Sequence, residues 1–287
     1  MIPVFNRRDE LVSCVRSVTD QQSWAVQEII VVDDASSDGS AEVAAELGCN
    51  VVRLGENSGA ATARNAGLER VTASWVCFLD SDDVWHPNLL ATLRGKLDTH
   101  ALVSGTGLLT VDGRVLTLLG TTQLPGQELR TPVDLLVPAN PVVTSATLVR
   151  TEIVREVGGF DEQLRYSEDL DLWLRVLERG SGWCDATPVL TYHRGSGSKS
   201  QQAHGRVESV RATIAGRYAG RTWWTPSVNE RYLGGMYWEG ARSALRGHQR
   251  AAAARHLVRA AAHPRRIQGV VESVARNRRL RRRAAAL

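Results

Sequence analysis

The stretch ASWVCFLDSDDVW, residues 73–85, joins a short apolar run to a cluster of aspartates. The run at 75–79 has the composition of a strand that is buried on both faces. Asp80, Asp82 and Asp83 follow it directly, and like charges this close together repel one another. The arrangement therefore predicts a positive charge bound at the end of this strand. A solvated acidic turn is the alternative interpretation.

Outward from this stretch, short apolar runs alternate with amphipathic segments of helical length. Alternation at this spacing predicts βαβ units and an α/β fold, with a mostly parallel sheet flanked by helices. The expected strands lie at 2–5, 29–32, 51–54 and 75–79, and the expected helices at 9–19, 40–47, 60–71 and 87–97. Farther along, strands are predicted at 101–111 and 142–150, a short helix from 151 up to two glycines at 158–159, and a longer helix at 167–180.

Polar side chains collect where the predicted strands end. Asn6 follows the first strand, and Asp33 and Asp34 directly follow the second. In sheets of this kind ligands bind at the carboxyl ends of the strands. Helix capping, the alternative, accounts for Asp38 and Ser40, but it does not account for two adjacent acids that continue a buried strand. A binding site is therefore predicted at this edge of the sheet.

The composition narrows the class of protein. With 43% hydrophobic and 23% charged residues among 287, the chain is expected to be globular, with one large domain and an appendage. It has no apolar run of the ~18 residues that span a bilayer and no signal-peptide pattern, so a cytoplasmic protein is expected. The cysteines are scattered without a CxxC pair, which indicates reduced core residues rather than a metal or redox site.

Five segments occur in order along the chain: IPVFN (2–6), VVDDASSDGS (31–40), ENSGAATARNAGLERVTASWVCFLDSDD (56–83), GGFDE (158–162) and SEDLDLWLR (167–175). Together they resemble the family 2 glycosyltransferases of the GT-A fold, over residues 1–200 or so. A single DxD triplet is a weak signal, whereas five motifs in order are specific. The resemblance implies a Rossmann-like GT-A domain. It also implies an inverting, metal-dependent transfer of a sugar from a UDP- or dTDP-sugar to an acceptor hydroxyl.

On the donor side, the resemblance implies a divalent cation, Mg²⁺ or Mn²⁺, held by Asp82 and Asp80. Such a cation neutralises the departing diphosphate as a Lewis acid, and it prefers oxygen ligands. Asp83 is expected to assist or to cap the next helix. For Arg64 the alternative is a surface arginine on a helix, paired with a nearby acid. The nucleotide-contacting positions that match the family's motifs are Pro3, Asn6, Asp33, Asp34, Arg64 and Asp80.

On the acceptor side, the family's pattern makes Asp169 the base that removes the proton of the acceptor hydroxyl. Glu168 is expected to orient Asp169 or to sit near the start of the helix. The alternative is that these acids only favour the helix macrodipole or pair with a base one turn on. That alternative suits Asp171, four residues before Arg175, better than it suits Asp169.

The segment TYHRGSGSKS, residues 191–200, resembles a loop that closes over the diphosphate in relatives. His193 is a candidate for an additional metal ligand, and Arg194 and Lys199 are candidates for phosphate binding. The alternative for His193 is a purely structural histidine. Because the segment is rich in glycine and serine, it is expected to become ordered when the donor binds.

Charge divides the chain into two regions. Residues 1–204 hold 17 Lys and Arg against 27 Asp and Glu, whereas residues 205–287 hold 18 Arg and 4 Glu. A GT-A domain at 1–204 and a basic, mostly helical region at 205–287 are therefore predicted. The basic region is expected to contact an anionic membrane surface, with solvated arginine as the alternative. Nucleic-acid binding is disfavoured because it leaves the acidic region unexplained.

Two other function classes remain as rivals. A sugar nucleotidyltransferase should carry a glycine-rich phosphate loop after the first strand, and FNRRDEL has no such glycines. A non-catalytic nucleotide-sugar-binding protein stays open. The expected partners are the donor, a glycan or lipid-linked acceptor, and the inner face of the plasma membrane. Because the first apolar run is only four residues long, we also expect the natural start to lie five to ten residues upstream of Met1.

Overall fold

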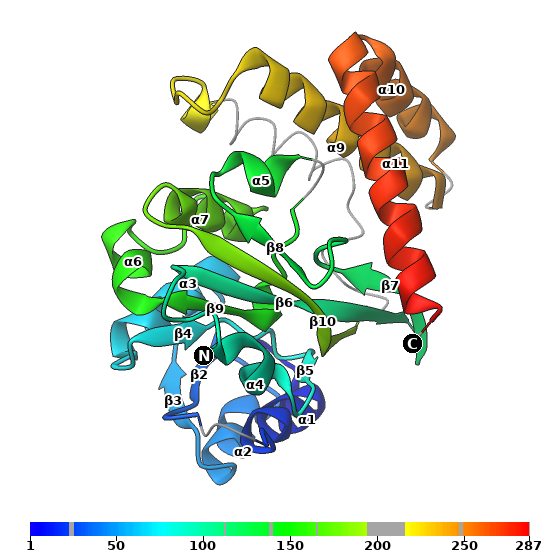
Figure 1. Cartoon of the computed structure of the whole chain (residues 1–287). Coiled ribbons are helices and arrows are strands. Elements are labelled where there is room, and N and C mark those ends of the chain that lie inside the picture. The colour runs from blue at the N-terminus through cyan, green and yellow to red at the C-terminus, as the bar shows by residue number, and fades with distance from the viewer. Residues whose placement is uncertain are drawn as a thin grey trace.

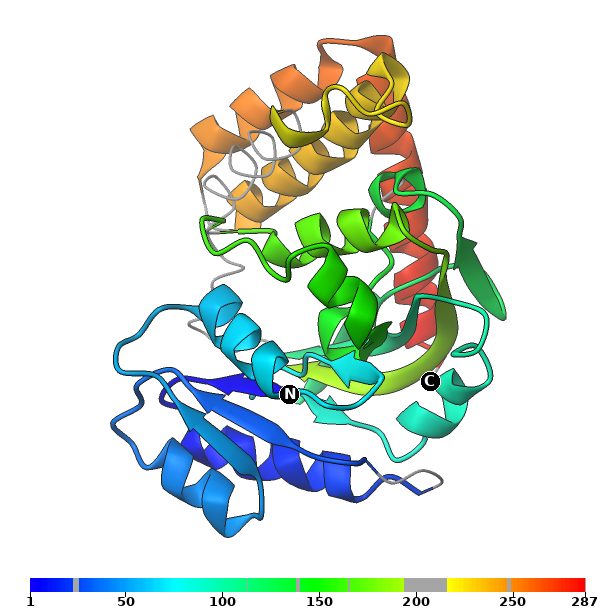
Figure 2. The same ribbon diagram turned by 90° about the vertical axis from the view of Figure 1, so that its left-hand side faces the viewer.

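Two β-sheets and the helices around them form the framework of the chain in a computed structural model (Figure 1). The structure describes residues 1–22, 26–111, 113–137, 140–164, 166–193, 216–246 and 249–286. Figure 2 shows the smaller sheet at one end of the molecule and the helices of residues 226–261 at the other, while the C-terminal helix runs from that end back along the side of the molecule.

The smaller sheet is entirely parallel. It consists of β1 (Ile2–Val4), β2 (Ile30–Asp33) and β3 (Asn50–Arg53), in the order β1-β2-β3. Three helices belong to this half: α1 (Arg8–Thr19), α2 (Ser40–Glu46) and α3 (Ala60–Arg70).

Alternate residues of β2 face opposite helices. Val31 packs in the cluster that contains Leu11 of α1, whereas Ile30 and Val32 pack in the cluster that contains Leu68 of α3. A strand that is buried on both faces needs a continuous apolar run, which is why the sequence pattern in this half predicts the strands to within a residue or two.

The larger sheet has seven strands and is mixed. Its central order is β4 (Trp75–Cys77), β9 (Thr147–Arg150), β6 (Leu102–Val111), β10 (Gly182–His193) and β5 (Val84–Trp85). In addition, β7 (Arg114–Leu119) pairs with β6, and β8 (Gly126–Leu129) pairs with β10. Only β6 and β10 are parallel among these pairs. The fold class is confirmed, although β7, β8 and β10 are not among the strands predicted from the sequence.

The two sheets meet at Met1. Its amino group donates to the carbonyl of Cys77 at 2.8 Å, and its carbonyl accepts the Leu79 N–H at 3.0 Å. This is the bonding pattern of parallel neighbours. The residues that follow β4 therefore lie at the same edge as the carboxyl ends of β1 and β2.

Four short helices complete the first two thirds of the chain: α4 (Leu89–Arg94), α5 (Val133–Leu136), α6 (Thr151–Glu156) and α7 (Glu168–Leu177). The segment predicted as a strand at 142–150 begins instead with a 3₁₀ turn, η1 (Thr144–Ala146). All four cysteines are free and buried, as expected. Burial raises the pKa of Cys77 to about 12, so its thiol stays protonated.

The basic region forms α9 (Pro226–Arg246), α10 (Arg250–Ala261) and α11 (Pro264–Ala284). Arg276 of α11 donates to the carbonyls of Gly120 and Asn140, at 2.8 and 3.2 Å. Arg283 donates to the carbonyl of Thr121 at 2.8 Å. Burial lowers the pKa of Arg276 to about 10. Part of the positive charge of α11 is therefore used to dock this helix on the sheet.

No helix among the described residues is both long enough and apolar enough to cross a membrane.

Candidate active site

A buried arginine joins the acids of two distant segments. Arg64 of α3 donates from Nη2 to Asp80 Oδ1 at 2.6 Å and from Nη1 to Glu168 Oε1 at 3.0 Å. The side chain is only 6% exposed, and its guanidinium lies 5.2 Å from the ring centroid of Phe160. Burial lowers the pKa of Arg64, but Asp80 and Glu168 outweigh it and raise this pKa above its usual value. Arg64 is thus paired with acids, as one interpretation expected, but it is not a surface residue.

The second aspartate of the turn has a different counter-ion. Arg7, at the start of α1, places Nη1 at 3.1 Å from Asp82 Oδ2 and at 3.5 Å from Glu10 Oε1. Burial raises the pKa of Asp82 above its usual value, Arg7 opposes this shift, and nearby Asp80 adds to it. Asp82 is thus a carboxylate whose negative charge is incompletely compensated.

Asp83, the third aspartate, is fully buried. Its Oδ1 accepts the backbone N–H of His193 at 3.3 Å, and its Oδ2 has no hydrogen-bond partner in the described part of the chain. Burial, and then the charge of Asp80, raise the pKa of Asp83 well above its usual value. Asp83 therefore ties the acidic turn to the end of β10. The N-cap position of α4 belongs to Asn88, so the capping interpretation of Asp83 is wrong.

A divalent cation fits the chemistry of this turn. Asp80 and Asp82 offer carboxylate oxygens, the ligands that Mg²⁺ and Mn²⁺ prefer, and a buried carboxylate oxygen of Asp83 lies unpartnered beside them. Among the described residues, no three His, Cys, Asp or Glu side chains form a ready-made metal site. The His193 ring instead pairs with Thr110 Oγ1 through Nδ1, at 3.1 Å.

Replacing Arg7 with Gln is expected to tighten the binding of Mn²⁺ to the nucleotide-free protein roughly fivefold, since a partly exposed ion pair is worth about 1 kcal/mol. Removing Arg7 takes away the cation that competes for Asp82. Titration of Mn²⁺ followed by its electron paramagnetic resonance signal measures this affinity. Arg8→Gln, which removes the same charge from an exposed neighbour, is the matched control. Equal affinities in the two variants would contradict the competition.

In the part of the site that is predicted to bind the nucleotide, side-chain oxygens accept hydrogen bonds from backbone N–H groups. Both oxygens of buried Asp34 accept N–H groups, from Ser58 and Gly59, each at 2.8 Å. Asp34 therefore fixes the loop that leads into α3, a role that the sequence analysis missed. Asn6 Oδ1 accepts the N–H of Ser37 at 2.8 Å.

Two more of the predicted nucleotide residues lie beside these. Asp33 is buried at the end of β2, and its Oδ1 accepts the Ser36 N–H at 3.2 Å. Pro3 lies opposite Val32 within the sheet. Arg194 and Lys199 lie outside the described residues.

Backbone strain is concentrated around this site. In the described residues, three positions other than glycine have a left-handed backbone: Asn6 (φ 50°), Ala35 (φ 62°) and Ser167 (φ 63°). Asn6 is itself a predicted site residue. Ala35 follows the paired aspartates of β2, and Ser167 precedes Glu168. Such conformations cost about 1–3 kcal/mol each and cluster at functional sites.

The acids at the start of α7 divide into two roles. Asp169 Oδ2 accepts a hydrogen bond from Thr144 Oγ1 at 3.0 Å. Burial and the charge of Asp169 raise the pKa of Glu168, while Arg64 opposes the shift. Asp171 is fully buried and pairs with Arg175 at 2.7 Å, as the alternative interpretation expected for this residue. Its other oxygen accepts the hydroxyl of Tyr218 at 2.8 Å.

The short turn η1 contributes two site residues that the sequence analysis missed. Thr144 holds Asp169, and Ser145 Oγ accepts the Asp80 N–H at 3.2 Å. The turn therefore lies between the acidic turn and the acids of α7. The signal was present as two adjacent hydroxyl residues inside an otherwise apolar run.

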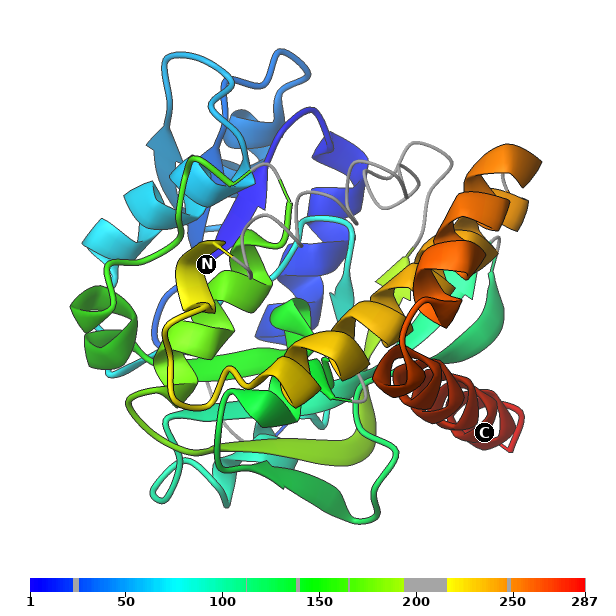
Figure 3. The same cartoon turned by 90° about the horizontal axis from the view of Figure 1, so that it is seen from above.

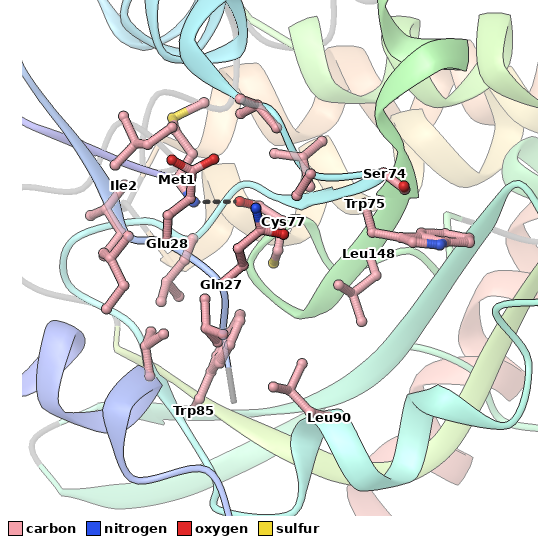
Figure 4. A pocket seen from close by; sticks show the side chains of 18 residues that line it. Met1, Ile2, Gln27, Glu28, Ser74, Trp75, Cys77, Trp85, Leu90 and Leu148 are labelled. Atoms are coloured by element: carbon pink, nitrogen blue, oxygen red, sulfur yellow. Dashed lines mark hydrogen bonds between the residues drawn. The ribbon is translucent and has the colours of Figure 1, made fainter. Parts of the chain in front are cut away.

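An apolar cavity of about 370 Å³ lies away from these residues, between the strands that join at Met1 (Figure 4). Apolar side chains such as Val76 and Leu148 make up most of its lining, and none of the predicted site residues is among them. Burial lowers the pKa of the Met1 amino group at its edge. The chemistry of the acidic turn, rather than this cavity, identifies the candidate active site.

Comparison with known proteins shows the family to which the chain belongs. The family model described as "Glycosyl transferase family 2" matches residues 1–158, more than half of the chain. The chain belongs to this family. It is therefore a glycosyltransferase.

Curated relatives of this family 2 chain include proteins of polysaccharide biosynthesis. It is 33% identical over 196 residues to the putative teichuronic acid biosynthesis glycosyltransferase TuaG of Bacillus subtilis, a match that covers 62% of this chain and 71% of TuaG. It is 29% identical over 237 residues to the succinoglycan biosynthesis protein ExoO of Rhizobium meliloti, covering 75% and 65%.

Solved structures share the fold at low identity. S. aureus TarS 1-349 in complex with UDP-GlcNAc superposes with a TM-score of 0.67 and 16% identity, covering 100% of this chain and 82% of that one. The mannosyltransferase PcManGT of Pyrobaculum calidifontis, in complex with GDP-Man and Mn²⁺, gives 0.62 and 17%, covering 96% and 78%. At this identity the likeness shows the GT-A fold alone.

Proposed function

We propose that this family 2 enzyme transfers a sugar, with inversion and with the help of a divalent cation, from a UDP- or dTDP-sugar to a hydroxyl of a glycan or lipid-linked acceptor. The observation that carries the proposal is the bridge through Arg64. It brings Asp80 of the acidic turn and Glu168, beside Asp169, to the two ends of one guanidinium. A carboxylate site for a cation and a carboxylate base thus lie next to each other.

On the donor side, Asp82 and Asp80 hold the Mg²⁺ or Mn²⁺, which when bound supplies Lewis-acid stabilisation of the departing diphosphate. Arg64 fixes Asp80 in position through the hydrogen bond from Nη2 to Oδ1. Asn6, Asp33 and Asp34 line the strand ends where the nucleoside binds.

On the acceptor side, Asp169 accepts the proton of the attacking hydroxyl. The hydroxyl of Thr144 holds the carboxylate of Asp169, while Glu168 is engaged by Arg64 and is not free to act as the base. The acceptor oxygen attacks the anomeric carbon directly as the bond to the diphosphate breaks, so the anomeric configuration inverts.

The names of similar proteins support the choice of substrates. TarS was solved with UDP-GlcNAc, which supports a uridine donor, whereas PcManGT was solved with GDP-Man. TuaG and ExoO are named for teichuronic acid and succinoglycan biosynthesis, and AmsB of Erwinia amylovora for amylovoran biosynthesis. Because these three relatives are each named for the biosynthesis of a polysaccharide, their names support an acceptor that is a growing glycan.

Thermal unfolding with a panel of nucleotide sugars tests the proposal. A ligand that binds only the native state stabilises it by about 2.7 kcal/mol at a hundred times its Kd, so the melting temperature is expected to rise with one UDP- or dTDP-sugar in the presence of Mn²⁺ or Mg²⁺. No rise with any member of the panel would refute it.

Release of free nucleotide from the stabilising donor separates the enzyme from a non-catalytic binder. Water is the smallest hydroxyl acceptor, so slow hydrolysis of the donor is expected even without the natural acceptor. The nucleotide is measured by chromatography. Stabilisation without any release, with water or with glycan acceptors, would favour the binding protein.

A further inference from the structure

Helix α11 has two opposite faces. Gly269, Ser273 and Leu280 are buried, and Arg276 and Arg283 reach carbonyls of the sheet region. With about 100° between successive residues of an α-helix, these positions form one side of α11. Figure 3 views α11 nearly along its axis, at the margin of the molecule, with the other elements gathered to one side of it.

The opposite side of α11 carries a stripe of four exposed residues, here called the outer stripe: Ile267, Val271, Arg278 and Arg282. Spacings of four, seven and four residues keep them within an arc of about 60°. Ile267 is 49% exposed and Val271 is 61% exposed, so two aliphatic side chains one turn apart lie together on the exposed side of the helix. The outer stripe is therefore apolar in its first half and cationic in its second.

Within the described residues, no acid neutralises the charge of the outer stripe. Neither Arg278 nor Arg282 has an ion-pair partner in the described part of the chain. The sole acid of α10 and α11 is Glu272, and Arg231 of α9 binds it at 2.7 Å. Arg266, on the inner side, binds Glu230 of α9. The arginines of α11 thus divide into those that dock the helix and those that face outward.

A further exposed apolar side chain, that of Val258, comes shortly before the outer stripe in the sequence. Val258 is 70% exposed and lies one turn before the end of α10, just ahead of the connection to α11. Exposed aliphatic side chains beside unpaired arginines are the composition of helices that lie in the interface of a bilayer.

We propose that the outer stripe of α11 docks on an anionic lipid surface. Lipid phosphates neutralise Arg278 and Arg282 while the acyl boundary covers Ile267 and Val271. A symmetric dimer through the outer stripe would set arginines against arginines, and nucleic-acid phosphates would leave the aliphatic half in water. The proposal goes beyond the sugar transfer and does not depend on it, because it concerns residues remote in sequence from the acidic turn.

Flotation with lipid vesicles tests the docking. The unmodified protein is expected to float with vesicles of phosphatidylcholine mixed with phosphatidylglycerol, but not with phosphatidylcholine alone. Arg278→Gln/Arg282→Gln is expected to weaken partitioning roughly 25-fold, about fivefold for each arginine near the surface. Ile267→Asp/Val271→Asp is expected to abolish it. Both pairs are exposed, and circular dichroism confirms that the variants fold.

Arg16→Gln/Arg70→Gln is the matched control, because it removes the same charge from exposed positions of α1 and α3. It should float as the unmodified protein does. Equal losses in control and stripe variants would mean adsorption by net charge alone and would overturn the proposal. So would failure of the unmodified protein to float, or a dimer in light scattering that Ile267→Asp/Val271→Asp converts to a monomer.

Discussion

Replacing Asp169 with Asn is expected to lower kcat about 10²- to 10⁴-fold, the usual worth of general base catalysis. The amide has the shape of the carboxylate and can still accept the hydrogen bond of Thr144, but it cannot take a proton from the acceptor. Because the role proposed for Asp169 concerns the acceptor, the donor should bind the variant as it binds the unmodified enzyme. Loss of kcat without a change in donor affinity identifies a residue that acts in the transition state.

Turnover is measured with the donor that thermal unfolding identifies, and donor affinity is measured by calorimetry. Glu156→Gln is the matched control, since Glu156 forms an exposed ion pair with Arg179, and both side chains are 54% exposed. The control should leave kcat within twofold or so. Undiminished turnover in Asp169→Asn would remove this residue from the reaction.

Replacing Asp82 with Asn is expected to weaken metal-dependent donor binding at least about a hundredfold, because a Lewis-acid cation contributes several kcal/mol to the stabilisation of phosphate charge. The amide removes the charge that holds the cation and keeps the volume of the side chain. The same change frees Arg7 from its ion pair, so metal-independent binding of the nucleotide should persist.

Calorimetry with and without Mn²⁺ separates the two contributions. Asp38→Asn is the control, because it removes an acid from the same edge of the sheet while an asparagine still accepts the N–H of Ser40 at the start of α2. If Asp82→Asn binds the donor with an undiminished dependence on Mn²⁺, another group holds the cation.

The strands of the parallel half could be predicted from the sequence, because their apolar pattern follows from the helices that cover both faces of the sheet. Val31 faces one helical layer and Ile30 and Val32 face the other, so β2 must be apolar throughout. The mixed sheet was not predictable in the same way. Strand β10 pairs with three other strands, shifts register near Pro188 and is partly exposed. These long-range pairings leave no clear period in the sequence.

The site was predictable as a set of acids but not as an arrangement. The sequence motifs predict Asp80, Asp82 and Asp169 as candidates. The counter-ions needed the structure, since Arg64 reaches Glu168 across 104 positions of the chain and Arg7 had no signal beyond its charge. The sequence did not indicate Thr144 and Ser145 as site residues, because β-branched and small residues in an apolar run favour a strand. In the structure their hydroxyls bind Asp169 and the Asp80 backbone.

The single guanidinium shared by Asp80 and Glu168 has an evolutionary consequence. A substitution at either acid alters the electrostatic potential felt by the other, so their effects on stability and turnover are not additive. A double-mutant cycle across Arg64 would record this epistasis directly. We therefore expect changes on the donor side and on the acceptor side of the proposed site to be coupled through one residue of α3.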